Sequence, residues 1–132
     1  GLVQQVGLTK DNAVSTPTNI HFAGWYTGTV KPGQEGLSII DGHVSGKYTD
    51  GIFKNLKKLK AGDAFVIEFG DKSTRGFNVV EVKTVPEKQA AALLFARKPD
   101  ISKQLNLITC GGTFNTVEQK YEDRVIVVAK AQ

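Results

Sequence analysis

The last third of the chain contains the run Leu105-Asn106-Leu107-Ile108-Thr109-Cys110-Gly111-Gly112. Its apolar residues before the cysteine predict a strand, and the two glycines after it predict a turn where the backbone can approach another molecule closely. The predicted strand therefore ends on a thiol at the edge of a sheet. Cys110 is the single cysteine of the chain, which excludes an intramolecular disulfide and an all-cysteine metal site.

Other short apolar runs, separated by glycine, proline or charged turns, also predict strands. Together with the cysteine run they cover residues 20–23, 37–40, 64–69, 76–82, 105–109 and 125–129. The runs 64–69 and 76–82 alternate apolar and polar residues and are joined by a short polar turn, which predicts an antiparallel hairpin. Phe77 and Val79 are expected on one face of its second strand and Asn78 on the other.

Helical patterning is confined to two segments. Residues 87–96 are rich in strong helix formers and begin just after Pro86, a favoured entry to a helix. Residues 50–56 place Ile52, Phe53 and Leu56 at helical spacing, which predicts one or two turns. Many short strands with few helices predict an all-β domain, and the pattern alone leaves a closed barrel and a sandwich both open.

Length and composition predict one domain. A chain of 132 residues can bury a single hydrophobic core. Residues 1–19 are polar and turn-rich and are interpreted as an N-terminal arm, so that residues 20–132 form the domain. The formal charge of +4 comes mostly from scattered lysines without a zinc pattern, an RNP-like motif or a long basic helix, so no nucleic-acid partner is predicted. No apolar run reaches the roughly 18 residues that a membrane span needs.

A lone cysteine is most often buried and inert, so Cys110 needs a partner to be a nucleophile. His43 follows the run 37–40 at the end of another predicted strand, where it can serve as the proton-transfer partner of a thiol. His21 lies inside an apolar segment and is interpreted as a core histidine. Asp41 could orient the His43 imidazole, although the favoured interpretation is a turn-forming aspartate.

Arg124 stands at the start of the last predicted strand. Arginine stays protonated and offers several fixed donors, as a group that stabilises an oxyanion should. The ordinary alternative is a surface ion pair with Glu122 or Asp123. The connection from Cys110 is about a dozen residues, a length compatible with an antiparallel pair that brings Cys110 and Arg124 side by side.

In combination, three segments resemble the Cys, His and Arg motifs of the sortase family of cysteine transpeptidases. They are Leu107-Ile108-Thr109-Cys110, Ile40-Asp41-Gly42-His43 and Asp123-Arg124-Val125-Ile126-Val127, in the family's order and rough spacing. The resemblance runs from about His21 to Ala129. The stretch from Trp25-Tyr26 to Gly42-His43 is most similar to class F, with classes D and A as alternatives, although Arg124 stands where class F commonly has Asn.

The resemblance implies an all-β, eight-stranded, sortase-type closed β-barrel with one or two short helices. It also implies that Cys110, His43 and Arg124 are catalytic: the thiolate would attack the Thr–Gly bond of a Leu-Pro-x-Thr-Gly-like signal, His43 would transfer protons, and Arg124 would hold the oxyanion. The connection 86–104 is expected to wall the groove or to pack on the barrel. Substrate contacts are expected at Ile40, Thr109, Gly111 and Leu94.

The implied partners are the sorting-signal peptide of surface proteins and an amine acceptor such as a peptidoglycan cross-bridge or lipid II. No cofactor and no metal are predicted, since the acidic group at 118, 122 and 123 lacks the pattern of a calcium loop. The implied enzyme is a monomeric thiol peptidase of the hydrolase class, which anchors proteins to the cell wall. Its implied location is the extracellular face of a Gram-positive membrane, held by a span preceding residue 1.

A cysteine hydrolase of another family and a non-catalytic binding module are the alternatives to a sortase. Papain-like and NlpC-type hydrolases place the cysteine early, at a helix start, and the histidine later. Here the histidine comes first, which argues against them. A non-catalytic β-barrel module that binds peptide or glycan, with Cys110 buried, stays open.

Overall fold

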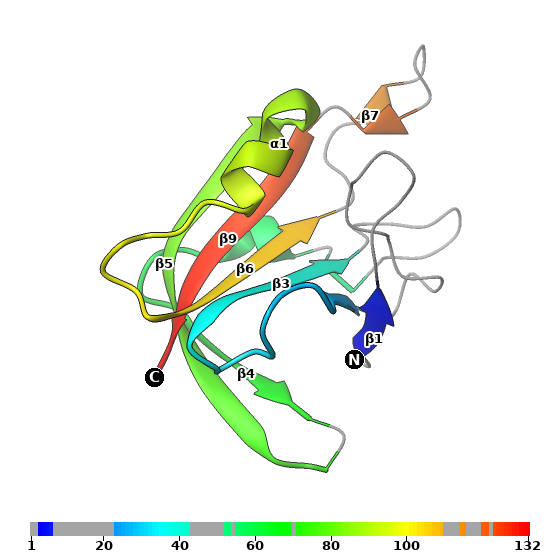
Figure 1. Ribbon diagram of the computed structural model, residues 1–132. Helices are drawn as coiled ribbons and strands as arrows, with labels where there is room; N and C mark the ends of the chain where they lie inside the picture. The colour runs from blue at the N-terminus through cyan, green and yellow to red at the C-terminus, as the bar shows by residue number, and fades with distance from the viewer. Residues whose placement is uncertain are drawn as a thin grey trace.

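One seven-stranded sheet organises the molecule, and the part of the chain that is described is mostly β (Figure 1). The computed structural model describes residues 3–6, 23–42, 52–53, 55–69, 71–109, 114–115, 120–121 and 123–132. The strands of the sheet are β1 (Val3–Val6), β2 (Ala23–Tyr26), β3 (Gly36–Gly42), β4 (Ala64–Glu68), β5 (Thr74–Pro86), β6 (Lys103–Thr109) and β9 (Asp123–Ala131). A separate hairpin pairs β7 (Phe114–Asn115) with β8 (Lys120–Tyr121).

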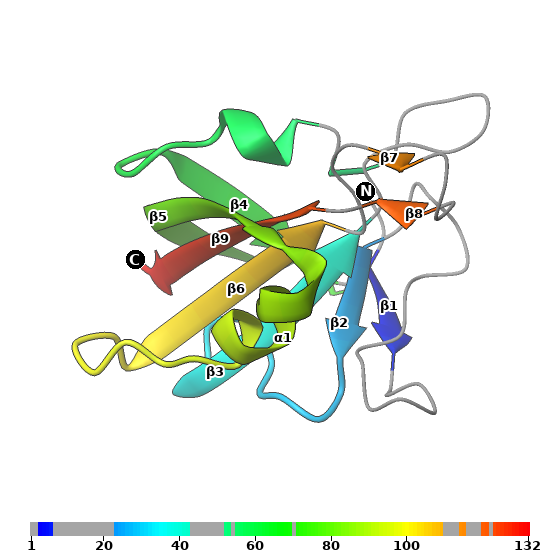
Figure 2. The ribbon, with the colours of Figure 1, turned by 90° about the horizontal axis from the view of Figure 1, so that it is seen from above.

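The strands follow the order β1-β2-β3-β6-β9-β5-β4 across the sheet. β1 is parallel to β2 and β3 is parallel to β6, while the other neighbours are antiparallel. The sheet curls into a half-barrel (Figures 1 and 2). Within the described ranges no ladder joins the edge strands β1 and β4, so these residues form a half-barrel and not a closed barrel of eight strands.

Several local predictions are confirmed. β4 and β5 form the predicted antiparallel hairpin, in which the rings of Phe65 and Phe77 stack with centroids 5.5 Å apart. The helix α1 (Glu87–Leu94) begins directly after Pro86, as predicted. The sequence did not predict β1, which lies in the segment interpreted as an arm and pairs with β2.

The predicted helical turns over residues 50–56 lie partly outside the described residues. Where the chain is described there, it forms a 3-10 helix, η1 (Leu56–Lys58), which begins at the end of the predicted segment and whose hydrogen bonds join residues three apart. The Leu56 N–H donates to the Phe53 carbonyl, and the Leu59 N–H donates to the Leu56 carbonyl. Leu59, the residue directly after η1, is extended, so the turn ends before an α-helix can form.

The sheet has apolar residues on both faces. The face inside the curl is called the interior face here. It holds one cluster that includes Ile40, Leu107 and Val127, and Ile52, Phe53, Leu56 and Leu59 pack over it. The opposite face, here the helix face, holds a second cluster in which Ile39, Ile108 and Ile126 pack against α1. Figure 2 shows α1 and η1 on opposite sides of the sheet. Both faces are therefore buried over the central strands, which explains their nearly continuous apolar sequences.

A β-bulge changes the alternation inside β5. Val79 pairs with Ala129 but Glu81 pairs with the next residue, Val128, so one residue is added at Val80. Val79 and Val82 consequently both reach the interior cluster, while Val80 packs in the helix-face cluster. The strict period of two expected from the sequence holds at 77–79 and fails after it.

Two buried amides connect the end of α1 to β6. Asn106 donates from Nδ2 to the Leu94 carbonyl at 2.7 Å and accepts at Oδ1 from Gln104 Nε2 at 2.9 Å. Gln104 also accepts from the Lys98 N–H at 2.8 Å and donates to the Ala96 carbonyl at 3.1 Å. These bonds satisfy backbone groups at the end of the helix and hold that segment against β6.

We expect Asn106→Ala to lower the free energy of unfolding by about 2–3 kcal/mol, because the buried Leu94 carbonyl and Gln104 amide each lose a partner. Urea denaturation measures this difference. Asn78→Ala is the matched control, since Asn78 accepts one exposed hydrogen bond from Gln132 and should change stability by less than about 1 kcal/mol. Equal losses in the two variants would contradict a structural role for the buried amides.

Candidate active site

The candidate site lies where β6 ends and β9 begins. The two strands are antiparallel, with Ile108 opposite Ile126. One residue further along, the Val125 N–H donates to Thr109 Oγ1 at 2.9 Å, so the contact between the strands reaches the last residue of β6. Arg124 precedes Val125 and pairs on its other side with Val85 of β5. Its side chain is half-buried.

Of the three predicted catalytic residues, only Arg124 lies within the described residues. His43 and Cys110 lie outside them, as does Gly111, so their positions stay predictions. His43 and Cys110 nevertheless each directly follow the last residue of a described strand. β3 ends at Gly42 and β6 at Thr109, and these residues are partners in the parallel β3–β6 ladder.

The other predicted substrate contacts are buried. Ile40, Thr109 and Leu94 have exposed fractions of 3%, 2% and 5%. Ile40 packs in the interior cluster, whereas Leu94 packs in the helix-face cluster, so the sheet separates their side chains. The described structure thus gives these side chains a packing role, and contact with a substrate stays a prediction.

Gly42 allows a close contact at the end of β3. A Cβ at this position would lie 2.7 Å from Phe53 Cδ2 and 2.9 Å from Ile52 Cγ2. These separations are shorter than carbon atoms tolerate, so any larger residue would displace the 52–53 segment. The glycine therefore lets that segment pack against the strand end that leads into His43.

Asp41 is a feature that sequence reasoning misinterpreted. It lies inside β3, between Gly24 of β2 and Ile108 of β6, and is not a turn residue. Its exposed fraction is 3%, and its Oδ1 atom has no hydrogen-bond partner in the part of the chain that the structure describes. Burial raises the pKa of Asp41 from 3.8 to about 7, against a smaller opposing effect of its own backbone hydrogen bond.

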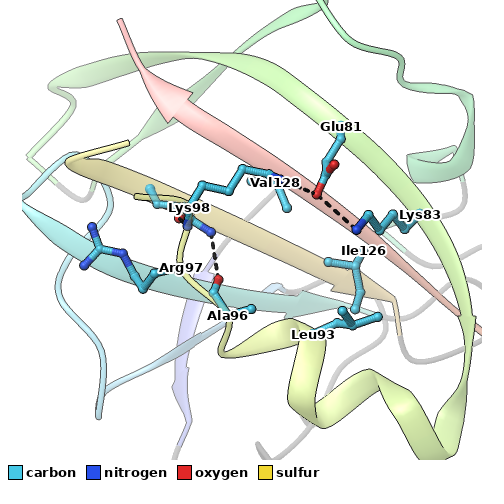
Figure 3. Close-up of a pocket in the computed structure, with 9 residues that line it drawn as sticks. Glu81, Lys83, Leu93, Ala96, Arg97, Lys98, Ile126 and Val128 are labelled. Carbon is cyan, nitrogen blue, oxygen red and sulfur yellow. Dashed lines mark hydrogen bonds and ion pairs between the residues drawn. The ribbon is translucent and has the colours of Figure 1, made fainter. Parts of the chain in front are cut away.

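A small pocket opens on the helix face between α1, β5 and β9 (Figure 3). Leu93, Ile126 and Val128 form its apolar lining, and its rim carries the ion pair of Glu81 with Lys98 at 3.0 Å. Partial burial raises the pKa of Glu81, but the hydrogen bond and charge of Lys98, aided by Lys83, keep it below its ordinary value. The pocket volume of about 110 Å³ is well below that of a typical ligand site.

No group of three His, Cys, Asp or Glu side chains within the described ranges is arranged to hold a metal ion. In the same residues, no helix has the length and apolar character needed to cross a bilayer.

Comparison with known proteins identifies the family. The model of the sortase domain matches residues 3–132, and the chain therefore belongs to the sortase family. This confirms the resemblance drawn from the three sequence motifs. No curated protein sequence matches the chain.

Three solved structures illustrate the similarity. The SrtA sortase from Actinomyces oris is 24% identical, with a TM-score of 0.67 over 98% of this chain and 69% of that one. Sortase C-1 from Actinomyces oris is 25% identical, with a TM-score of 0.63 over 83% of this chain and 58% of that one. Sortase A from Corynebacterium diphtheriae is 22% identical, with a TM-score of 0.68 over 96% of this chain and 59% of that one.

The sortase fold thus extends over nearly the whole of this chain. In the other direction, the chain spans less than two thirds of the length of two of these three structures. Because the matches include both a sortase C and two A-type sortases, they do not select a class.

The buried Asp41 carboxyl makes stability depend on pH. The folded state keeps its proton to about pH 7, whereas the unfolded state releases it near 3.8, so the free energy of unfolding falls as the pH rises through this window. When the pH is raised from 5 to 8, we expect Asp41→Asn to lose less stability than the unsubstituted protein, by on the order of 2–3 kcal/mol.

Urea denaturation at both pH values measures this effect. Ser38→Ala is the control, because Ser38 is an equally buried residue of β3 whose hydroxyl carries no charge. It should follow the pH dependence of the unsubstituted protein. Parallel pH curves for the Asn variant and the unsubstituted protein would contradict the raised pKa of Asp41.

Proposed function

We propose that this domain is a cysteine transpeptidase that cleaves a Leu-Pro-x-Thr-Gly-like sorting signal between Thr and Gly and transfers the acyl group to an amine. Membership of the sortase family supports a sortase-type activity. The observation that carries the assignment of residues is the register of β6 against β9. Continued by two residues beyond Ile108 and Ile126, that register would set Cys110 opposite Arg124.

The strand ends support the place of His43 in the same way. β3 and β6 run parallel and finish as partners at Gly42 and Thr109. His43 and Cys110 are each the next residue, with a Cα roughly 3.8 Å beyond. In the proposal, three adjacent strands therefore contribute one catalytic residue each: His43 after β3, Cys110 after β6 and Arg124 within β9.

In the proposed reaction, the Cys110 thiolate attacks the carbonyl carbon of the signal threonine. The bond from sulfur to carbon forms, the bond from carbon to the glycine nitrogen breaks, and His43 protonates the departing amine. The incoming amine then attacks the thioester and gives its proton to His43, which releases the thiolate. Arg124 donates hydrogen bonds to the oxyanion that forms in each step.

The remaining parts of the proposal come from the family. The partners are the sorting signals of surface proteins and an amine acceptor such as a peptidoglycan cross-bridge or lipid II, and the setting is the outer surface of a Gram-positive cell. Residues 20–132 carry the catalytic residues of a monomeric domain, and the half-barrel is the larger part of a closed eight-stranded barrel. Class F stays the preferred class, with D and A as alternatives.

A non-catalytic module that binds peptide or glycan is the second candidate. The buried surroundings of Thr109, the residue before the cysteine, are the observation in its favour. In such a module a thiol on the next residue would only need to fill space.

We expect Cys110→Ala to abolish cleavage of a fluorogenic Leu-Pro-x-Thr-Gly peptide, because the thiolate is the nucleophile that forms the acyl-enzyme. Mass spectrometry should detect a thioester adduct with the unsubstituted protein and none with the variant. A peptide that binds with equal affinity to both proteins and is cleaved by neither would establish the binding module instead.

Arg124→Ala should lower kcat by about 10²–10³-fold, as expected for loss of a donor to an oxyanion, while Arg124→Lys retains the charge and loses less. Steady-state cleavage of the same peptide measures both variants. Lys130→Ala removes an exposed cation from the same strand and is expected to retain full activity. If Lys130→Ala lost as much activity as Arg124→Ala, the effect would reflect general charge and not a site.

A further inference from the structure

Asp41 has no role in the reaction described above, yet it is a buried acid close to the proposed catalytic residues. Its Oδ1 atom lacks a partner within the described residues, and its side chain is 3% exposed. An acid in such surroundings is costly to retain, because burial opposes its ionisation. A buried carboxyl held at this cost, with one oxygen unpaired among the described residues, points to a functional role.

Strand geometry puts Asp41 on the proposed catalytic side of the sheet. Ile39, two residues earlier in β3, packs in the helix-face cluster, and alternation assigns Asp41 to the same face. Ile126, two residues after Arg124 in β9, packs in that cluster as well. The Asp41 carboxyl and the Arg124 guanidinium therefore start from the same face of the sheet.

Chain connectivity limits how far Asp41 can be from the two catalytic residues. Gly42 and Thr109 are partners in the register of β3 with β6. Asp41 is the residue before Gly42, and Cys110 is the residue after Thr109. The Cα atoms of Asp41 and Cys110 are therefore at most roughly 12 Å apart, and those of Asp41 and His43 at most roughly 8 Å. At such separations within a protein, charges interact strongly enough to change ionisation.

Few other ionisable groups compete on this face in the described part of the chain. β2 contributes Tyr26, which packs edge-on against Phe95, and β9 contributes Arg124 two strands away. β6 contributes only neutral side chains next to Asp41, and α1 covers the face with apolar ones. Glu81 and Lys83 belong to β5, which is separated from β3 by two strands. In the segment after α1, Lys98 pairs with Glu81 at 3.0 Å and Arg97 donates to the Ile101 carbonyl at 2.9 Å.

We propose that Asp41 is a positioning residue of the transpeptidase, whose negative charge favours the protonated form of His43 and so sets the pH range in which His43 and Cys110 work together. This inference rests on the sortase function proposed above. The same charge raises the pKa of the Cys110 thiol and so opposes formation of the thiolate that the reaction needs.

Both effects shift the pH range of activity in the same direction. An ionised Asp41 raises the pKa of His43 and the pKa of Cys110, so the state with thiolate and imidazolium forms at higher pH. Because the pKa of Asp41 itself is about 7, this charge appears within the range in which the pair titrates. Removing the charge should therefore move both limbs of the pH–rate profile to lower pH.

The first test is the rate at which iodoacetamide alkylates Cys110, which the single cysteine of the chain makes unambiguous. At pH 8, we expect Asp41→Asn to react about fivefold faster than the unsubstituted protein, because more of its thiol is ionised. Asp41→Glu retains the charge and should react at close to the original rate. Ser38→Ala, on the same strand, should leave the rate unchanged. Equal rates for Asp41→Asn and the unsubstituted protein would overturn the inference.

The second test is the pH dependence of kcat/KM for peptide cleavage. We expect the optimum of Asp41→Asn to move to lower pH, and Asp41→Glu to restore it. A uniform loss of rate at every pH, without movement of the optimum, would identify Asp41 as merely structural. Asp41→Ser, which is neutral and smaller, provides the same test if the Asn variant does not fold.

The two readouts separate this inference from the proposed function. Faster alkylation of Asp41→Asn without peptide cleavage by any variant would reject the transpeptidase and retain the charge coupling between Asp41 and Cys110. Peptide cleavage that depends on Cys110, with alkylation rates and pH optima independent of Asp41, would do the reverse.

Discussion

The pairing of β6 with β3 on one side and β9 on the other is the interaction on which the rest of this structure depends. β6 is the central strand of the sheet, parallel to one neighbour and antiparallel to the other. Its residues face two different cores, so a shift of its register by one residue would turn Leu105 and Leu107 out of the interior cluster. The same register fixes which residues of β3 and β9 lie beside the end of β6.

That constraint explains why the candidate site draws on distant parts of the sequence. β3 brings Asp41 and Gly42, β6 brings Thr109, and β9 brings Arg124 and Val125 to one end of the sheet. Gln104 and Asn106 on β6 hold the end of α1 over the helix face. One strand thus organises both the end of the sheet that holds the candidate site and the segment that packs on the helix face.

Much of this could be predicted from the sequence where the signal is local. The alternation at 64–69, the helix formers after Pro86 and the apolar runs at 105–109 and 125–129 each depend on residues close together, and the structure contains these elements. The family could be predicted because its motifs keep their order along the chain. The place of Arg124 at the start of the last strand also followed from its neighbours.

Features that depend on tertiary packing could not be predicted. Asp41-Gly42 has the composition of a turn, but β2 and β6 pair with this segment on both sides and keep it extended. The bulge at Val80 and the short 3-10 helix at Leu56 likewise follow from packing in the interior cluster and not from the propensities of their local sequences. The parallel pairing of β3 with β6 has no signal in either strand alone.

That parallel pairing also has a consequence for how the chain folds. Its partners, such as Gly36 and Lys103, are 67 positions apart in the sequence. Contacts of such high contact order close a long loop before they gain any compensating burial, so they slow folding. During synthesis, β3 emerges well before β6. Until β6 follows, the edge of this apolar strand that will pair with β6 has unpaired backbone groups. The strand that precedes the proposed nucleophile is therefore also the one that protects the nascent domain from aggregation.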